Sequence, residues 1–122
     1  MNNMKVIIAG SRNVNDKKLV ADALRTYQRI GKITEIVCGE ARGVDAIGRQ
    51  LAEAQHIPVK SFPADWQKYG KPAGYIRNKE MAMYADALVA IWDGESRGTR
   101  HMIDIMNELG KPALVHFTEK QR

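Results

Sequence analysis

The chain has 122 residues, of which 44% are hydrophobic and 27% charged, and its formal net charge is +5 at pH 7. These values are typical of one soluble globular domain, and the single cysteine, Cys38, excludes an internal disulfide. The positive charge admits an anionic partner, but the basic residues are mixed with acids and form no dense run typical of a nucleic-acid-binding arm. The apolar run at residues 6–9 is too short for a signal peptide or a membrane span, so we expect a cytoplasmic protein without a membrane partner.

Strand and helix patterns alternate along the chain. In order, the patterns predict a strand at residues 4–9, a helix at 15–30, a strand at 33–38, a helix at 44–55 and a strand at 57–62. A non-periodic segment rich in Pro, Gly and aromatic residues follows at 63–74, and we interpret it as a functional loop. The remaining patterns predict a helix at 75–85, a strand at 86–93, a helix at 99–109 and a strand at 112–117.

This alternation predicts the α/β class. We expect a single domain over residues 1–122, built as a Rossmann-like, doubly wound parallel sheet of about five strands with helices on both faces. In such sheets a ligand binds beyond the carboxyl ends of the strands, near the point where the strand order reverses. The loops that follow the first, second and fourth strands are therefore candidates for a binding site.

Those loops share glycine and arginine. They read GSR at residues 10–12, GEARGVD at 39–45 and DGESRGT at 93–99, so the pattern Gly-Glu-small-Arg-Gly occurs twice, although the sequences diverge after each copy. Glycine lets the backbone approach a ligand, a helix N-terminus favours an anion, and arginine donates two hydrogen bonds to phosphate or carboxylate. The loops predict ligand-binding roles for Gly10, Ser11, Arg12, Gly39, Glu40, Arg42, Gly43, Asp45, Gly94, Ser96, Arg97, Gly98 and Thr99. The alternative is that they are tight turns in which arginines pair with glutamates.

The segment 63–74 and the helix after it add other donors. Trp66 and Tyr69 have rings that can stack on a base or a ribose, and Arg77 and Asn78 can reach the same crevice. The alternative for Trp66 is that it covers the edge of the core. His101 lies beside the third loop, where a histidine can serve as a general acid, but we favour the alternative that it is a surface histidine. No spacing of His, Cys and acidic residues predicts a metal site, and no loop carries a Walker-type phosphate motif.

Taken in order, the segments GSR, GEARGVD, PADWQKYGKPAGYIRNKEMA and DGESRGTRHMI resemble the YspA-like, cpYpsA-related group of the SLOG superfamily. Relatives of this group are the LONELY GUY phosphoribohydrolases and the Rossmann domain of DNA-processing protein A. The resemblance implies a Rossmann-like fold that binds a nucleotide or a nucleotide-derived molecule, such as a nucleoside monophosphate, ADP-ribose or an NAD-related compound, with no cofactor required. It places residues 94–99 in a phosphate-binding loop and residues 77–79 at the sugar-phosphate, and it implies a homo-oligomer.

The resemblance leaves the activity open. In the phosphoribohydrolases a carboxylate follows the phosphate-binding loop, whereas the three positions after Thr99 hold none. The remaining candidates for a catalytic role are Arg77, Asp45, Asp93 and Glu95. The leading hypothesis is therefore a nucleotide-binding sensor, carrier or sequestering module. The alternatives are a phosphoribohydrolase-type N-glycosidase and a DNA-binding module, although the charge pattern does not favour a nucleic-acid partner.

Overall fold

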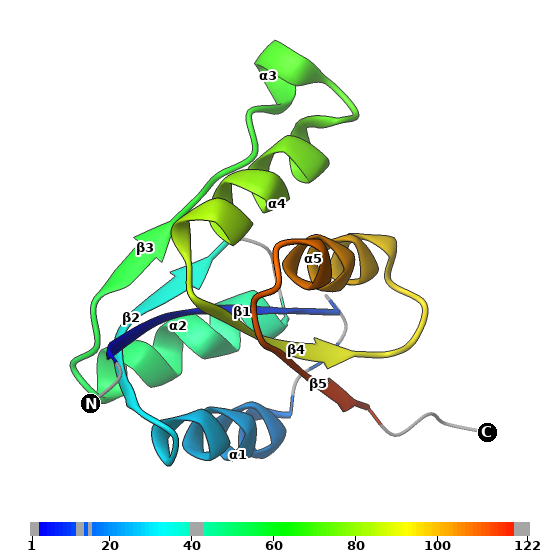
Figure 1. The fold of residues 1–122 in the computed structure, drawn as a ribbon. Coiled ribbons are helices and arrows are strands. Elements are labelled where there is room, and N and C mark those ends of the chain that lie inside the picture. The colour runs from blue at the N-terminus through cyan, green and yellow to red at the C-terminus, as the bar shows by residue number, and fades with distance from the viewer. Residues whose placement is uncertain (1–2, 12–13, 15, 40–42, 119–122) are drawn as a thin grey trace.

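The computed structural model describes residues 3–11, 14, 16–39 and 43–118. These residues form one five-stranded parallel sheet with helices against both of its faces (Figure 1), as the alternating pattern predicts. The elements in chain order are β1 (Asn3–Gly10), α1 (Lys17–Gln28), β2 (Lys32–Cys38), α2 (Val44–Ala54), β3 (Val59–Ser61), α3 (Trp66–Tyr69), α4 (Ala73–Tyr84), β4 (Ala87–Trp92), α5 (Arg97–Glu108) and β5 (Ala113–Phe117).

The strand order is β3-β2-β1-β4-β5. The chain builds outward from β1 to β3 and then returns to the other side of β1 to add β4 and β5. The order therefore reverses between β1 and β4, which pair in parallel along residues 6–10 and 87–91. At this point the connections leave the sheet in opposite directions, and a crevice opens at the carboxyl ends of the two strands.

Two apolar clusters, one on each face of the sheet, hold the helices in place. Residues of α1 and α2 pack with Val6, Ile8 and Ile36 on one face, and residues of α4 and α5 pack with Ile7 and Leu88 on the other. The alternation within β1 follows from the period of two in a strand, which points neighbouring side chains to opposite faces. Residues 87–91 of β4 are fully buried, as its continuous apolar pattern predicts for a central parallel strand.

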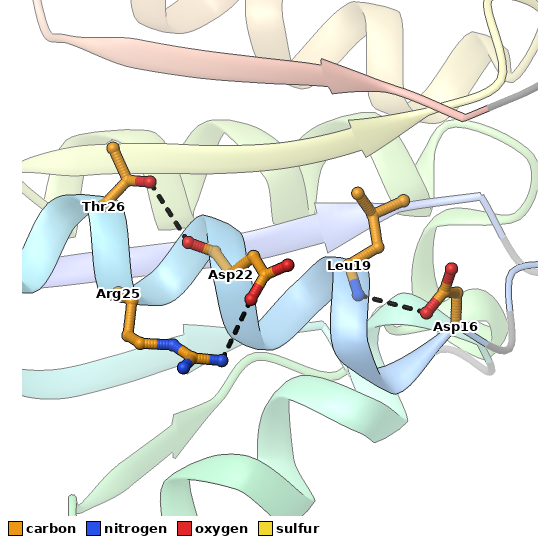
Figure 2. A network of polar contacts seen from close by, with 5 residues as sticks. All are labelled: Asp16, Leu19, Asp22, Arg25 and Thr26. Carbon is orange, nitrogen blue, oxygen red and sulfur yellow. Dashed lines mark hydrogen bonds and ion pairs between the residues drawn. The ribbon is translucent and has the colours of Figure 1, made fainter.

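Local capping explains where the helices begin. Asp16 is the N-cap of α1, and its side chain accepts a hydrogen bond from the N–H of Leu19 at 3.1 Å (Figure 2). Figure 2 also shows Arg25 donating to the Asp22 carboxylate at 2.9 Å, one turn along the same helix. Ser96 caps α5 in a similar way, so that this helix begins two residues before the predicted start at residue 99.

The predicted loop at 63–74 is partly wrong. Residues Trp66–Tyr69 form the one-turn helix α3, and α4 begins within the same segment at Ala73. The side chain of Asp65 caps α3 by accepting the N–H of Lys68 at 3.0 Å, and Gly70, with φ of 67°, ends it. Periodicity cannot reveal so short a helix, because one turn holds too few positions for a repeat. None of the helices in the described part of the chain has the length and apolar character to span a bilayer.

The end of β1 has no room for a side chain at Gly10. A Cβ atom built there would overlap the carbonyl oxygen of Ile91 in β4 and would lie 2.7 Å from Val44 Cγ2 in α2. The next residue, Ser11, donates its N–H to that same carbonyl at 3.1 Å. Glycine at this position therefore lets β1, β4 and α2 meet at the edge of the crevice.

We expect Gly10→Ala to lower the free energy of unfolding by about 1–3 kcal/mol, the usual cost of overpacking a close contact. The matched control is Gly98→Ala in the first turn of α5, because nothing among the described residues lies within 4 Å of a Cβ built there. This control should unfold at the wild-type urea concentration or above it, since alanine favours a helix over glycine by about 1 kcal/mol. Equal midpoints for the two variants in urea unfolding would contradict the close approach at Gly10.

Candidate functional site

A cleft of about 370 Å³ lies at the carboxyl ends of β1 and β4. This volume falls within the range of roughly 300–1,000 Å³ found for small-molecule sites. The cleft takes residues from the ends of β1 and β4, from the first turns of α2 and α5, and from α4. Its lining residues are Ala9, Gly10, Ser11, Asp45, Arg77, Asn78, Met81, Asp93, Ser96, Gly98, Thr99 and Met102.

Asp93 organises the turn from β4 to α5. Its carboxylate oxygen Oδ1 accepts hydrogen bonds from the N–H groups of Glu95 and Ser96, both at 2.8 Å. Its own N–H donates to Ser11 Oγ at 3.1 Å, which ties this turn to the end of β1. The Glu95 N–H holds the pKa of the Asp93 carboxyl below its usual range, burial opposes this effect, and the Ser96 N–H adds to it. Asp93 is therefore ionised near neutral pH and holds the loop in shape.

The N-terminus of α5 forms one wall of the cleft. Ser96 Oγ accepts the N–H of Thr99 at 3.4 Å and lies 3.1 Å from Thr99 Oγ1, while Trp92 Nε1 donates to the Ser96 carbonyl at 3.0 Å. These contacts fix the first turn of a helix of 12 residues, whose N-terminal end favours negative charge. Gly98 leaves open space in front of this turn. The wall therefore suits an anionic group.

Asp45 forms the wall on the side of β2, where it contacts the backbone of Gly39. The Asp45 carboxylate, in the first turn of α2 and only 7% exposed, accepts the N–H of Gly39 at 3.2 Å. The carbonyl of Gly39 in turn accepts a hydrogen bond from Arg77 Nη1. A Cβ built on Gly39 would overlap the guanidinium group of Arg77, so only glycine lets the arginine lie against the backbone.

Arg77 and Asn78 join this wall to α5. Besides Gly39, Arg77 Nη1 donates to the carbonyl of Phe62 at 3.2 Å, and Arg77 Nε donates to Asn78 Oδ1 at 3.1 Å. Asn78 Nδ2 donates to the carbonyl of Gly98 at 3.1 Å and lies 3.2 Å from His101 Nδ1. The bonds connect β2, α4 and the N-terminus of α5 across the cleft. They also bring a permanent positive charge into its lining.

Comparison with known proteins identifies the family of the chain. The sequence model described as "YspA, cpYpsA-related SLOG family" matches residues 4–69. The chain is also 36% identical over 123 residues to "Gene 61 protein" of Mycobacterium phage D29, an alignment that covers 95% of this chain and 98% of the phage protein. The chain belongs to the YspA, cpYpsA-related SLOG family. This confirms the predicted resemblance, and membership of the SLOG family is consistent with binding of a nucleotide-related ligand.

The SLOG fold brings residues from all three predicted loops into one cleft. Of the predicted ligand-binding residues, those that line it are Gly10, Ser11, Asp45, Arg77, Asn78, Ser96, Gly98 and Thr99. Of the carboxylates proposed for catalysis, Asp93 and Asp45 line it, whereas Glu95 is exposed on the β4–α5 turn and is not part of the lining. Arg12, Glu40 and Arg42 lie outside the described residues.

Other predicted residues are placed elsewhere. Gly39, Gly43, Gly94 and Arg97 belong to the same loops but are not part of the cleft lining as the described residues define it. Trp66 and Tyr69 are 53% and 41% exposed on α3, which extends beyond the end of α4 and away from the sheet (Figure 1), and they do not line the described cleft. Trp66 instead packs on α4, because a Cβ built at Gly74 would lie 3.4 Å from its ring.

The sequence analysis missed Met81 and Met102 as cleft residues. Both are buried in the core, and both also reach the lining. The sequence does contain a signal for them, because residues at i and i+3 share one face of a helix. Met81 lies three residues after Asn78, and Met102 lies three residues after Thr99. Among the described residues, no group of three or more His, Cys, Asp and Glu side chains could hold a metal ion.

The lowered pKa of Asp93 gives a prediction for Asp93→Asn. The charged carboxylate stabilises the fold fully above the unfolded-state pKa of about 3.9, and this contribution is lost as the pH falls through the lower folded-state pKa. We expect the variant to lose about 1 kcal/mol or more of unfolding free energy near neutral pH, with a smaller loss towards about pH 3.

Urea unfolding over a series of pH values measures this difference. Asp22→Asn, which removes a carboxylate that pairs with Arg25 on the surface of α1, is the matched control. The control should cost less at neutral pH, because exposed ion pairs contribute little. A loss for Asp93→Asn that stays constant from neutral to acid pH would show that the carboxylate charge does not hold the turn.

Proposed function

We propose that this SLOG protein binds a nucleotide-derived phosphate ligand in the cleft and acts as a sensor, carrier or sequestering module. The observation that carries the proposal is the N-terminal turn of α5, which faces the cleft beside the open position at Gly98. A phosphate group placed there would meet the positive end of the helix. Ser11 and Thr99 add hydroxyl groups, and Arg77 adds a permanent positive charge to the lining.

The contacts of the carboxylates support binding rather than turnover. Asp93 accepts the backbone N–H groups of Glu95 and Ser96, and Asp45 accepts that of Gly39, so each has a part in shaping a loop. A ribose can lie between the two sides of the cleft, whose lining includes Asp45 of α2 and Thr99 of α5. Membership of the SLOG family supports a nucleotide-related ligand as the occupant.

A charge test at Gly98 examines the phosphate position. We expect Gly98→Asp to keep or raise stability, because the site has open space and an acid in the first turn favours a helix. The added carboxylate should repel a phosphate and weaken binding of AMP, ADP-ribose or NAD by about tenfold or more. Gly98→Asn, which fills nearly the same volume without the charge, is the matched control and should bind more tightly than Gly98→Asp.

Thermal shift with millimolar ligand measures both binding and folding, because a ligand at about 100 times its Kd stabilises the folded state by about 2.7 kcal/mol. The wild type should gain several degrees with at least one of the ligands, and Gly98→Asn should keep more of that gain than Gly98→Asp. If none of these nucleotides raises the melting temperature of the wild type, the proposed function is wrong.

A second candidate function is an N-glycosidase, because Asp45 and Asp93 line the same cleft and a carboxylate can stabilise the sugar cation formed on cleavage. Overnight incubation with AMP and NAD, followed by chromatography, separates the two functions. The binding proposal predicts no released adenine or nicotinamide. Release of base by the wild type, abolished in Asp45→Asn, would establish the enzyme instead.

A further inference from the structure

The carboxamide of Asn78 uses both of its donor hydrogens inside the protein, and its oxygen accepts a hydrogen bond there. It is 7% exposed, and it contacts Arg77 through Oδ1 and both Gly98 and His101 through Nδ2, at distances of 3.1, 3.1 and 3.2 Å. A side chain with both donors already engaged cannot donate to a phosphate ligand without breaking one of these bonds. Asn78 therefore acts on its neighbours Arg77 and Gly98, although it lines the cleft.

These contacts determine the protonation of His101. A guanidinium group can only donate, so the Asn78 atom that faces Arg77 Nε is the carbonyl oxygen and the other atom is the NH₂ group. One hydrogen of that group points to the carbonyl of Gly98, and the other faces His101 Nδ1. Nδ1 must then carry a lone pair, which makes His101 a neutral ring with its proton on Nε2.

The surroundings of His101 favour this neutral form. Burial lowers its pKa, and the carboxylates of Asp104 and Glu108 on the same helix oppose the shift without reversing it. From α4, the ring of Tyr75 packs against His101 with ring centroids 4.4 Å apart, and Arg77 lies on the far side of Asn78. Arg100 lies 3.9 Å from Asp104 and partly neutralises it. A proton on Nδ1 would place two donors against each other, so protonation breaks this contact with Asn78.

We propose that Asn78 and His101 are positioning residues, which hold Arg77 and the first turn of α5 in place only while His101 is neutral. The consequence for ligands rests on the proposed function: affinity for a phosphate ligand falls as His101 gains a proton. The opposite sign is also physically possible, because a positive charge near the cleft would attract an anion. The sign of the pH dependence therefore separates a positioning role from a simple charge effect.

The free protein tests the contact without any ligand. Nitrogen-detected NMR of the imidazole at about pH 7.5 should show the Nε2–H tautomer for His101. On lowering the pH, the amide signals of Gly98 and Thr99 should shift together with the His101 titration, and they should not follow such a titration in His101→Asn. An Nδ1–H tautomer or an imidazolium at this pH would overturn the proposal, as would amide signals that do not follow His101.

Calorimetric titration with ADP-ribose tests the consequence, since its diphosphate bridge keeps its charge across this pH range. Between about pH 7.5 and 5.5, wild-type affinity should fall about fivefold more than that of His101→Asn, which is the effect of losing one hydrogen bond. Asparagine places an acceptor oxygen close to the position of Nδ1 and does not titrate, so His101→Asn should bind tightly at both values. His101→Leu, which lacks an acceptor, should bind weakly at both.

His56→Asn is the matched control, because His56 is exposed at the opposite end of the sheet, just after α2. This variant should keep the wild-type pH dependence. Tighter wild-type binding at low pH, or equal binding by His101→Leu and His101→Asn, would overturn the positioning role while leaving the proposed function intact. If ADP-ribose and the other nucleotides bind to no variant, the proposed function fails, and the NMR result still decides the contact between His101 and Asn78.

Discussion

The hydrogen bond from the Asp93 N–H to Ser11 Oγ joins β1 and β4 at the point where the strand order reverses. The turn from β4 into α5 depends on this connection. It fixes the position of Asp93, whose carboxylate shapes the turn into α5, and that turn places Ser96 at the helix N-cap. Ser11 is nearly fully buried, so its hydroxyl is shielded from competing water and its geometry is well determined. The contacts from Ser11 through Asp93 to Ser96 therefore fix the direction of the N-terminus of α5, the end that favours an anion.

A second set of contacts, independent of the first, closes the other side of the cleft. It runs from Asp45 through the backbone of Gly39 to Arg77, and then through Asn78 to the carbonyl of Gly98. Both sets end on the first turn of α5, one through its N-cap and one through Gly98. A change in either set moves the same first turn of α5. His101 does not line the cleft, but it can influence this turn through its contact with Asn78.

The fold was predictable because it depends on patterns that are local in the sequence. The apolar run of β4 and the helical spacing of α1 each specify an element, and the alternation of elements specifies a parallel sheet. The loops at the strand ends followed directly, which is why Ser11, Ser96 and Gly98 were correctly expected at one edge of the sheet. Their location could be predicted without knowing where any side chain points.

Contacts between elements were not predictable in this way. Trp66 was expected in the binding site by its chemistry, but the Asp65 cap places it on a separate turn against Gly74. The role of His101 depends on its distance from Asn78 across two helices, which no spacing within the sequence encodes. Only the packing of α4 against α5 brings these two side chains together.

The repeated pattern Gly-Glu-small-Arg-Gly also shows that the sequence alone does not reveal contacts between elements. In the first copy the leading Gly39 is crowded by Arg77, and the final Gly43 has φ of 72° at the start of α2. In the second copy the leading Gly94 has φ of 83°, and the final Gly98 has an ordinary helical backbone with open space in front of it. The position that requires a left-handed backbone is therefore at opposite ends of the two copies. The same residue type therefore meets different constraints in the two copies. Gly39 allows the close approach of the Arg77 guanidinium group, and Gly98 leaves the N-terminus of α5 accessible. This difference favours two separate solutions over an internal duplication.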